Sequence, residues 1–334
     1  MRAWQIHEVG HFSDVLELVD IPAPEPGPGQ VLVEVGAAGL NFADLLVCQG
    51  RYQVRSPLPL VPGLEAAGRV VASGPAVDLP VGSRVVGMVA PPHGAFAQFT
   101  LMDAATALVL PDTVDDVTAV SMHVAYQTAW FALHRRGGIG PGDVVIVHAA
   151  AGGVGSAALE LAVAAGARVV ATAGGPEKVA ACLNAGAWRA VDHRRADYES
   201  RIREAIGERG ADLVFDPVGG SIGELSMRLL AWEGRHLVIG FASGDVPRVR
   251  ANHVLVKNYS VVGVHWAGYL EHDPVAVAEA HSALLELLTR GRIRPPEVTV
   301  LDMDRLLTGL SDLEERRTTG RLVLSVNTFD GGQP

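Results

Sequence analysis

The sequence is poor in cysteine, in charged side chains and in long uninterrupted apolar runs. Its 334 residues include only two cysteines, Cys48 and Cys182, which excludes a disulfide framework and a four-thiolate zinc site. Charged residues make up 19% and hydrophobic residues 49%, which is typical of a packed protein and excludes general disorder. Glu160 and Arg168 interrupt the most apolar stretch, so no segment is predicted to cross a bilayer. We therefore expect a soluble, cytoplasmic protein.

Cationic side chains are also in deficit. There are 27 Lys and Arg against 37 Asp and Glu, a formal net charge of -10. An acidic surface repels phosphate backbones, so a nucleic acid is not expected as a partner, and neither is a membrane. The length of the chain predicts about two domains.

The N-terminal part of the chain, 1–120, reads as β-rich. Its short apolar runs, each bounded by Gly or Pro, are Val31–Val35, Gly68–Ala72, Val85–Val89 and Phe96–Thr100. The Pro- and Gly-rich stretch 22–29 is too short to separate domains and predicts a turn between two strands. Regularly spaced short strands of this kind indicate a barrel-like β fold.

The pattern changes after Pro111, where helices begin to alternate with buried-type strands. Helices are predicted at Asp115–Leu133, Ser156–Ala165, Glu177–Ala185 and Pro274–Thr289. Strands are predicted at Val144–Val147, Arg168–Ala171, Ala190–Val191, Leu213–Phe215, His236–Ile239, Ser260–Val264 and Arg321–Val326. This alternation is typical of a parallel, doubly wound sheet in an α/β protein.

A glycine-rich turn follows the first of these buried strands. Val144–His148 runs into Ala149-Ala150-Ala151-Gly152-Gly153-Val154-Gly155 and then into a helix. Read as G-x-G-x-x-G, its key places are Ala150, Gly152 and Gly155, where Gly152 lets the backbone approach a pyrophosphate and Gly155 lets the helix lie close to the sheet. A tight turn without a ligand has the same glycines, but the complete strand–turn–helix unit favours a dinucleotide site at the helix N-terminus.

The end of the second strand bears on which dinucleotide is bound. An NAD site usually has an acid there for the ribose 2′-hydroxyl, whereas this chain has Ala171-Thr172-Ala173-Gly174-Gly175. Glu177 follows Pro176 and suits the first turn of a helix. Lys178 on that helix can reach a 2′-phosphate, and His193-Arg194-Arg195 adds positive charge, although all of these cations could simply be solvated. The pattern favours NADP(H) over NAD(H).

Six short motifs occur in a fixed order along the chain. They are Asn41-Phe42-Ala43-Asp44, Gly50-Arg51-Tyr52, Pro62-Gly63-Leu64-Glu65-Ala66-Ala67-Gly68, Gly94-Ala95-Phe96-Ala97-Gln98, Ala151-Gly152-Gly153-Val154-Gly155 and Arg316-Arg317-Thr318-Thr319-Gly320. In this order they resemble the motifs of the zinc-free quinone oxidoreductases, the zeta-crystallin-like group of the medium-chain dehydrogenase/reductase superfamily. The resemblance implies an α/β protein with a GroES-like β-rich catalytic domain, 1–122 and 275–334, and a Rossmann coenzyme domain with a doubly wound parallel sheet, 123–274.

The zinc-dependent relatives in this superfamily differ at two places. They carry Cys where Asn41 stands and Gly-His-Glu where Gly63-Leu64-Glu65 stands. Both expected metal ligands are therefore missing, and we expect no metal. Without a Lewis acid to stabilise an alkoxide, alcohol oxidation is a poor fit, and reduction of an electron-poor acceptor is a better one.

The resemblance implies three catalytic residues in the first domain: Asn41, Tyr52 and Asp44. Asn41 would hydrogen-bond the coenzyme or a substrate carbonyl, or it is merely an Asx-turn residue. Tyr52 would offer its hydroxyl to an acceptor oxygen, or it is merely a half-buried aromatic. Asp44 would orient the loop backbone, and Glu65 is expected to be a structural acid that accepts hydrogen bonds.

The resemblance also implies a set of coenzyme contacts. They are Asn41, Thr128, Ala151, Gly152, Gly153, Val154, Ala173, Gly174, Lys178, His193, Phe241, Ala242, Ser243, Val264, His265 and Arg317. Strand packing is the competing explanation for His265, and a surface ion pair with the neighbouring glutamates is the competing explanation for Arg317. Several relatives have Tyr where this chain has Leu46 and His193, so those two contacts differ from the pattern.

The resemblance leads to one main function and two alternatives. The main expectation is an NADPH-dependent quinone oxidoreductase that transfers a hydride to a small electron-poor acceptor without a metal. The alternatives are a reductase of enones or α,β-unsaturated thioesters, and an NADP(H)-binding protein without turnover. The late apolar strand Asn258–Val264 is predicted at the sheet edge, and relatives commonly join two sheets there, so a homodimer is expected.

Overall fold

The chain folds into two contact-defined units. The computed structural model describes residues 1–52, 56–294 and 297–327. One unit contains Met1–Val124 and Glu297–Pro334, and the other contains Ala125–Pro296, so the first boundary falls inside helix α3, Asp116–Trp130. The predicted division assigned 275–296 to the first unit, whereas the structure places this segment in the second.

The segment 275–296 belongs to the second unit because its main chain is bound there. Helix α10, Pro274–Thr289, accepts a hydrogen bond at the Val277 carbonyl from Gln127 Nε2 over 3.2 Å. Beyond the helix, the Arg294 carbonyl accepts from the Tyr126 hydroxyl over 3.2 Å, and the Arg294 N–H donates to Glu160. No motif in the sequence marks these contacts, since each joins residues more than a hundred positions apart.

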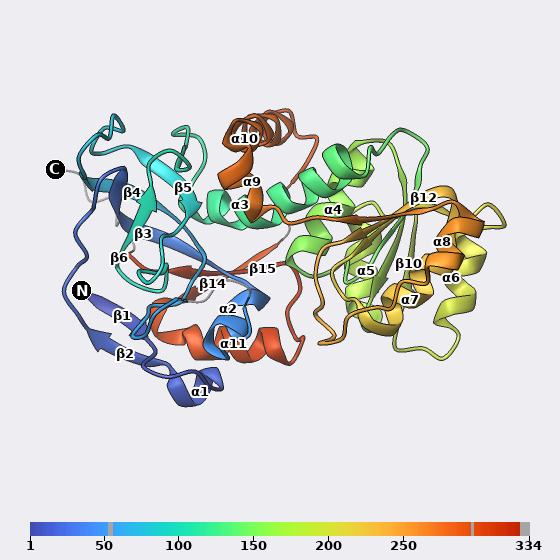
Figure 1. Cartoon of the computed structure of the whole chain (residues 1–334), viewed down its shortest axis with the longest axis horizontal. Coiled ribbons are helices and arrows are strands. Elements are labelled where there is room, and N and C mark those ends of the chain that lie inside the picture. Colours follow the sequence, from blue (N-terminus) through green and yellow to red (C-terminus); the bar gives the residue numbers. More distant parts are fainter. Residues whose placement is uncertain (53–55, 295–296, 328–334) are drawn as a thin grey trace. The chain divides into compact units, whose positions relative to one another are not determined.

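The first unit is built mainly from one largely antiparallel sheet. Its strands are β1 (Arg2–Gln5), β2 (Glu17–Asp20), β3 (Gln30–Leu40), β4 (Glu65–Ser73), β5 (Arg84–Met88), β6 (Phe99–Asp103), β7 (Leu108–Val109), β14 (Val298–Asp302) and β15 (Arg321–Ser325). The order in the main sheet is β14-β15-β3-β4-β5-β7, with β6 also paired to β3, while β1 and β2 form a separate hairpin-like pair (Figure 1). The β-rich character predicted for 1–120 is confirmed.

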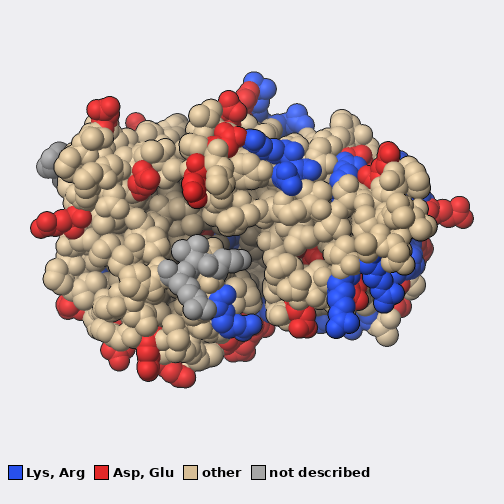
Figure 2. Space-filling view, viewed as in Figure 1, with Lys and Arg blue, Asp and Glu red and all other residues tan. Residues whose placement is uncertain are grey.

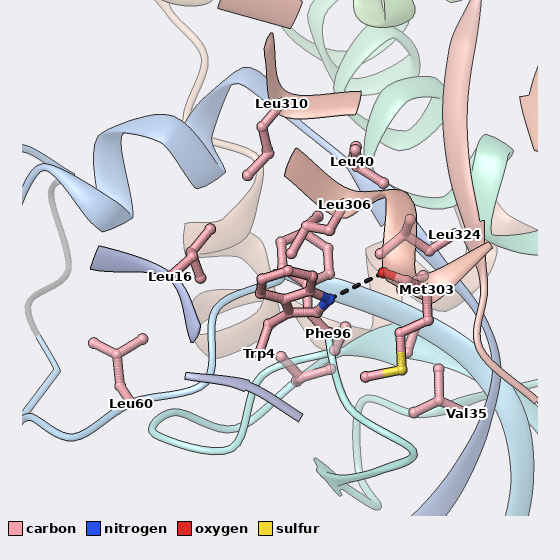
Figure 3. Packing of buried hydrophobic residues seen from close by; sticks show 14 of the residues in the cluster. Trp4, Leu16, Val35, Leu40, Leu60, Phe96, Met303, Leu306, Leu310 and Leu324 are labelled. Atoms are coloured by element: carbon pink, nitrogen blue, oxygen red, sulfur yellow. Dashed lines mark hydrogen bonds between the residues drawn. The ribbon is translucent and has the colours of Figure 1, made fainter. Parts of the chain in front are cut away.

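The core of this unit brings together residues from both ends of the chain. Trp4 donates its indole N–H to the Met303 carbonyl over 2.9 Å, and it lies among Leu306, Leu310 and Phe96 (Figure 3). The short helices around this core are α1 (Phe12–Val15), α2 (Phe42–Cys48), the 3₁₀ turn Met303–Arg305 and α11 (Leu306–Glu314). The C-terminal segment is thus part of the N-terminal unit.

One predicted strand in this unit is displaced. The apolar run Phe96–Thr100 was expected to be a strand, but β6 begins only at Phe99. The N–H of Phe96 donates to the Pro62 carbonyl over 3.0 Å, in a turn, while its side chain is fully buried. The prediction was wrong here because an apolar side chain can reach the core from a turn as well as from a strand.

The second unit contains the parallel sheet that the alternating pattern predicted. Its strands are β8 (Val144–Val147), β9 (Arg168–Ala173), β10 (Arg189–Asp192), β11 (Ala211–Asp216), β12 (Leu230–Val238) and β13 (Ser260–Gly263). They lie in the order β10-β9-β8-β11-β12-β13, and every pairing is parallel. The chain moves outward from β8 to β10 and then returns to β11 on the other side of β8, so the strand order reverses there. In doubly wound sheets, ligands bind at the carboxyl ends of the strands at such a reversal.

Helices connect these strands and pack against them. They are α4 (Gly153–Ala164), α5 (Pro176–Asn184), α6 (Tyr198–Ile206), α7 (Gly220–Leu229), α8 (Ala251–Lys257), α9 (Ala267–His272) and α10 (Pro274–Thr289). Helix α4 packs on β8 and β9, and α7 packs on β11 and β12. The long helix predicted to end at Leu133 instead continues from α3 into a π-helical turn, Phe131–Arg136. Among the residues described, no helix has the length and apolar composition needed to span a membrane.

Charge is distributed unevenly between the two units. The first unit carries 9 Lys and Arg against 20 Asp and Glu, and the second carries 18 against 17. Figure 2 shows blue groups of Lys and Arg over the second unit, while red side chains are spread over the first. The acidic excess of the whole chain therefore lies in the first unit, and the second is close to neutral.

Candidate active site

The phosphate turn is shaped by short backbone hydrogen bonds. The Ala150 N–H donates to the Thr172 carbonyl over 2.9 Å, and the Gly152 N–H donates to the Ala149 carbonyl over 2.9 Å. A Cβ on Gly155 would lie 2.2 Å from the Ala149 oxygen, so only glycine fits where α4 meets the turn. This confirms the close helix packing predicted for Gly155.

The surface above this turn is open. A Cβ on Gly152 would meet only the Ala149 oxygen, at 3.4 Å, so nothing in the protein requires glycine at this position. Gly152 is the N-cap of α4, and Gly153 and Val154 form the first turn of that helix, while Ala151 before them is buried. The free N–H groups of a helix N-terminus favour phosphate oxygens, so the space beside Gly152 fits a pyrophosphate.

A buried histidine supports the turn from below. His148 Nδ1 lies 2.9 Å from Thr172 Oγ1, and Nε2 lies 2.7 Å from Ser226 Oγ. Because the Ser226 hydroxyl donates to the Ile222 carbonyl, it must accept from Nε2–H, which assigns the neutral tautomer. Burial lowers the pKa of His148 to about 4. No motif in the sequence marks this residue, which directly follows the apolar strand β8.

The predicted residues at the end of β9 come together. The His193 N–H donates to the Ala173 carbonyl over 3.0 Å. A Cβ on Gly174 would lie 3.0 Å from His193 Nε2 and 3.1 Å from Arg194 Nε, so both side chains border this glycine. Lys178 stands in the first turn of α5, and its pKa is lowered by burial and by the positive charge of Arg194. Cations therefore converge on one corner of the sheet.

Asp192 holds this corner in place. Its Oδ1 accepts hydrogen bonds from the N–H groups of Gly175, over 2.9 Å, and Arg194, over 3.0 Å. These two N–H groups lower the pKa of the Asp192 carboxyl. Arg195, by contrast, forms an ion pair with Asp197 at 2.9 Å. The two adjacent arginines are thus distinguished: Arg195 is engaged with an acid, and Arg194 borders the glycine turn.

The remaining predicted coenzyme residues of the second unit lie in loops and on one helix. Phe241, Ala242 and Ser243 follow the carboxyl end of β12, and the Ala242 N–H donates to the Pro217 carbonyl over 3.0 Å. Beside them in the sheet, the Val264 N–H donates to the Val238 carbonyl over 3.0 Å, directly after β13.

Two further candidates in this unit have different settings. His265 is exposed and lies beyond the end of β13, so strand packing does not explain it. Thr128 is buried on α3.

The first unit buries a cluster of polar side chains around Asn41. Asn41 Nδ2 donates to Glu65 Oε1 over 2.8 Å, and Asn41 Oδ1 accepts from Arg321 Nη1 over 3.0 Å. Arg321 Nη2 also donates to Glu65 Oε1 over 2.5 Å, and the Val124 N–H donates to Glu65 Oε2 over 2.9 Å. Glu65 therefore accepts hydrogen bonds from three groups, which is the structural role predicted for it.

Asp44 stands beside this cluster at the start of α2. Its Oδ2 accepts from the Asn41 N–H over 2.7 Å, which is the backbone-orienting role predicted for it. The side chain is fully buried, and its Oδ1 has no hydrogen-bond partner among the described residues. Burial, with the nearby charge of Glu65, raises the pKa of Asp44 to about 8. Asp44 is thus a neutral acid at neutral pH.

The pKa values of two residues near Asp44 are raised by the same buried environment. Tyr52 is half-buried, and its pKa is raised by burial and by the negative charge that Asp44 can carry. Burial and Asp44 also raise the pKa of Cys48 to about 12. The Tyr52 hydroxyl therefore stays protonated and remains a hydrogen-bond donor. The residues that follow it, 53–55, lie outside the described chain.

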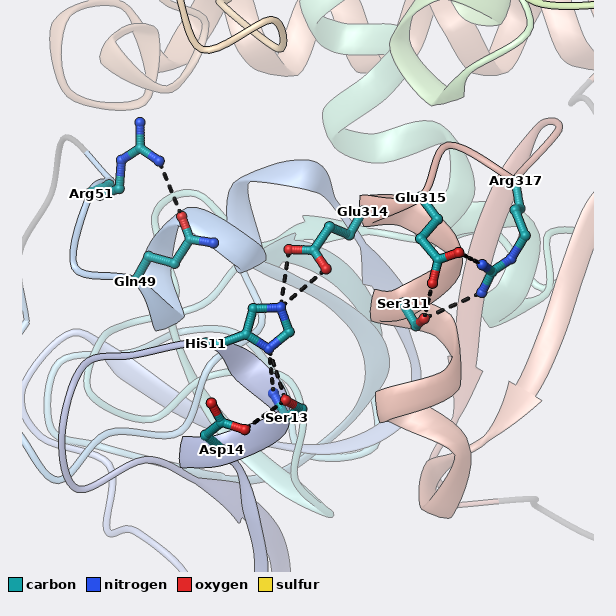
Figure 4. Close-up of polar contacts among 9 residues, drawn as sticks. All are labelled: His11, Ser13, Asp14, Gln49, Arg51, Ser311, Glu314, Glu315 and Arg317. Atoms are coloured by element: carbon teal, nitrogen blue, oxygen red, sulfur yellow. Dashed lines mark hydrogen bonds and ion pairs between the residues drawn. The ribbon is translucent and has the colours of Figure 1, made fainter.

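Arg317 has the ion pairs that were considered as its alternative. Its guanidinium lies 2.7 Å from Asp312 Oδ1. It also pairs with Glu315 and contacts the Ser311 hydroxyl (Figure 4). Its side chain is half-exposed in this arrangement. The partners of Arg317 in the structure are thus residues at the C-terminal end of α11 and directly after it.

Sequence families match both units. A family described as "Alcohol dehydrogenase GroES-like domain" matches 27–112, and one described as "Zinc-binding dehydrogenase" matches 153–283. The residues present do not fit a catalytic zinc: the side chains of Asn41 and Glu65 are bound to the Arg321 guanidinium, whose positive charge repels a cation. No group of three potential metal ligands gathers anywhere in the described ranges.

Individual proteins are similar over nearly the whole chain. "Quinone oxidoreductase-like protein 2" of Rattus norvegicus is 36% identical over 91% of this chain and 87% of its own length. The structure of Escherichia coli quinone oxidoreductase complexed with NADPH is 30% identical, with a TM-score of 0.91, and covers 98% of this chain and 100% of that one. The phthioceranic/hydroxyphthioceranic acid synthase of Mycobacterium tuberculosis is 33% identical over 96% of this chain, but only over 15% of its own length.

Proposed function

Because this chain belongs to the medium-chain dehydrogenase/reductase superfamily and is an oxidoreductase of that superfamily, we propose that it uses NADPH to reduce a quinone or a similar electron-poor acceptor. The observation that carries the choice of coenzyme is the corner at the end of β9. There Lys178 and Arg194 border a glycine turn, and Asp192 accepts hydrogen bonds from the backbone instead of facing a ribose. Two cations at this corner suit a 2′-phosphate.

The other parts of the coenzyme would be held by residues along the carboxyl edge of the same sheet. The open backbone of Ala151, Gly152 and Gly153, with Val154, would hold the pyrophosphate. The loops that contain Phe241–Ser243 and Val264–His265 would border the nicotinamide. Ala173, Gly174 and His193 would border the adenosine. Thr128 and Arg317 remain proposed contacts, and Arg317 would have to leave its ion pairs in order to serve.

When bound, NADPH supplies a hydride to the acceptor, and the protein supplies position and a hydrogen-bond donor. We assign the donor role to the Tyr52 hydroxyl, whose raised pKa keeps it protonated. Asn41 is held at both ends of its amide by Glu65 and Arg321, so its orientation is fixed before any ligand arrives. Asp44 fixes the backbone of Asn41 from within α2. Preorganised donors of this kind stabilise the developing oxyanion of a hydroquinone or an enolate.

The proposal is tested by following NADPH oxidation by the purified protein with 1,4-benzoquinone, an enone and an enoyl-CoA in parallel, each repeated with NADH. Turnover with the quinone, faster with NADPH, supports the proposal. Tyr52→Phe should then lower kcat with little change in the affinity for NADPH, and an unchanged kcat removes Tyr52 from the mechanism. No turnover with any acceptor favours the alternative of a coenzyme-binding protein without catalysis.

The second candidate function is reduction of an enone or an α,β-unsaturated thioester. It is favoured by the similarity to part of a mycobacterial acid synthase. A CoA thioester needs cations for its phosphates, and the first unit, with 9 Lys and Arg against 20 Asp and Glu, is a poor partner for them. Turnover with the enone or the thioester alone would move the function to this class.

We also propose that the protein is a homodimer joined at strand β13. This strand is the last in its sheet, as predicted, and the preceding helix α8 exposes the apolar side chains of Leu255 and Val256. Unpaired edge strands pair readily with a second copy. Gel filtration at working concentration should give the dimer mass, and a monomer mass contradicts this assembly.

A further inference from the structure

Two loops at the carboxyl edge of the second unit are bound to each other. The first, 217–220, follows β11, and the second, 239–245, follows β12. The Ala242 N–H donates to the Pro217 carbonyl, and the Ser243 N–H donates to the Val218 carbonyl, each over 3.0 Å. The Gly220 N–H donates to the Asp245 carbonyl over 2.9 Å. With three hydrogen bonds between them, the loops form one structural piece.

A single carboxylate fixes this piece to the sheet. Asp216, the last residue of β11, accepts at Oδ1 from the N–H groups of Val218 and Gly219, each over 2.9 Å. Its main-chain oxygen accepts from the Ile239 N–H over 3.0 Å, so the same residue is bonded to the start of both loops. The Asp216 side chain thus holds the first loop directly, and the second loop is held by the Asp216 main chain and by its hydrogen bonds to the first loop.

His236 holds the second oxygen of that carboxylate. It lies on the neighbouring strand β12, is fully buried, and its Nε2 is 2.9 Å from Asp216 Oδ2. Burial by itself raises the pKa of Asp216, but the hydrogen bond from His236, the nearby His148 and the Gly219 N–H outweigh it, and the pKa is lowered. The carboxylate is thus ionised and accepts from several donors at once. His236 Nδ1 has no hydrogen-bond partner among the described residues, so the one hydrogen bond of the ring in that part of the chain is the bond to Asp216.

The helix above the pair leaves just enough room for it. A Cβ on Gly223 of α7 would lie 2.8 Å from Asp216 Oδ2 and 2.9 Å from Pro247 Cβ. An alanine there would push against the carboxylate on one side and a proline ring on the other. The position of the pair is thus set by the neighbouring strand, by the loop N–H groups and by the helix.

We infer that Asp216 and His236 are positioning residues for the nicotinamide half of the coenzyme, because they fix the two loops that contain Phe241, Ala242 and Ser243. This inference rests on the proposed function and adds to it a control that lies beneath the ligand surface. The adenosine half is proposed to lie elsewhere, at Lys178 and Arg194, which follow β9 and β10, whereas the two loops follow β11 and β12 on the other side of β8 in the strand order. The pair therefore affects one half of the ligand and leaves the other unaffected.

The test compares two ligands on three variants. NADPH spans both halves of the site, whereas adenosine 2′,5′-bisphosphate occupies only the adenosine half. His236→Leu removes the donor at similar volume, and His236→Gln keeps an N–H donor. His253→Leu is the matched control, because His253 lies on α8 and its ring hydrogen-bonds the Tyr259 hydroxyl just before β13, away from the two loops in the chain. Dissociation constants are measured by calorimetry, with circular dichroism to check folding.

We expect His236→Leu to weaken NADPH about tenfold or more, while the bisphosphate changes by less than about twofold. His236→Gln should recover most of the loss, and His253→Leu should bind both ligands as the wild type does. Should His236→Leu fail to fold, Gly223→Ala, which displaces the same carboxylate, is expected to give the same split between the two ligands.

Three results overturn the inference. Equal weakening of both ligands would mean that the pair only supports the fold, and no change in either would mean that the loops do not depend on it. If the wild-type protein binds neither ligand, the proposed coenzyme is wrong and the inference falls with it. The bisphosphate measured on the wild type separates this last failure from the first two.

Discussion

The two units bury polar groups in different ways. The first, which is strongly acidic, encloses a full ion pair, in which Arg321 compensates Glu65 while Asp44 is kept neutral. The second, which is close to neutral overall, encloses His148 in its uncharged form and surrounds the single charge of Asp216 with N–H donors. The buried carboxylate of Glu65 in the first unit is therefore compensated by a guanidinium, whereas that of Asp216 in the second unit is compensated by backbone and imidazole donors.

This difference shows where ligand chemistry can be placed. A whole-chain charge of -10 suggests repulsion of every phosphate, yet the acidic excess is confined to one unit. The phosphate turn and the cationic corner both belong to the other unit, where the local balance does not oppose an anion. The net charge of this protein thus indicates whether an anionic ligand can bind only when it is counted separately for each unit.

The largest expected effect comes from removing the buried cation Arg321 from the first unit. Arg321→Met leaves the Glu65 carboxylate buried without a compensating positive charge, and we expect a loss of about 3–5 kcal/mol of unfolding free energy. Hydrogen exchange should show the loss in peptides from β3 and β4 and not in those from β8.

The matched control is Arg317→Met, which removes a half-exposed ion pair and should cost less than about 1 kcal/mol. The double variant Arg321→Met with Glu65→Gln should be more stable than Arg321→Met alone. An equal loss of unfolding free energy in Arg321→Met and Arg317→Met would show that burial does not make the Arg321 ion pair more important than an exposed one.

The next effect separates packing from ligand binding within the second unit. Gly155→Ala drives a Cβ into the Ala149 oxygen and should destabilise the unit by about 1–3 kcal/mol. Gly152→Ala meets no such obstacle, so its stability should be retained while the affinity for NADPH falls. Thermal unfolding and calorimetry check the pair. Equal destabilisation by both substitutions would contradict the separate roles assigned to the two glycines.

The pH dependence of stability should have opposite signs in the two units. The pKa of His148 is about 4 in the folded protein against 6.5 unfolded, so the unfolded state binds more protons and the second unit loses stability as pH falls from 6.5 toward 4. The pKa of Asp44 is about 8 folded against 3.8 unfolded, so the first unit loses stability as pH rises from 4 toward 8. Each change is on the order of a few kcal/mol at most.

Hydrogen exchange across this range, resolved by peptide, measures the two trends in one sample. The same sign in both units would show that one of the two buried groups does not titrate as its surroundings require.

The smallest effect on stability at acidic pH is expected from Asp44→Asn. The amide oxygen can still accept from the Asn41 N–H, and the uncharged side chain resembles the protonated acid, so the change should be within about 0.5 kcal/mol below about pH 4, where Asp44 is protonated in both the folded and the unfolded state. What should disappear is the decline of first-unit stability toward pH 8. A decline that persists in the variant would assign the titration to another group.

The features that were predicted from the sequence are those that neighbouring residues determine. The turn at Gly152 and Gly155, the helix predicted at Glu177–Ala185 and the edge position of β13 follow from local pattern and strand order, and the structure has all three, with the helix one residue earlier at Pro176–Asn184. The family resemblance also led correctly to a two-part α/β fold, because motif order survives changes at single positions.

The features that were not predicted depend on pairs of residues that are distant in the chain. Arg321 meets Glu65 across 256 positions, and His236 meets Asp216 across two neighbouring strands. Asp192 resembles an ordinary strand-end acid, and only the structure shows that backbone N–H groups occupy it. Nothing in the local sequence marks such partners, because the fold brings them together only when strands and loops have paired.

The measurement that tests the account most directly is the affinity of the wild-type protein for NADPH and for NADH, with Arg194→Ala and Arg195→Ala beside it. We predict that NADPH binds about tenfold or more tightly than NADH, that Arg194→Ala removes most of this preference, and that Arg195→Ala leaves it intact. Equal affinity for the two coenzymes in the wild type, or an equal loss in both variants, would contradict the cationic corner as the site of the 2′-phosphate.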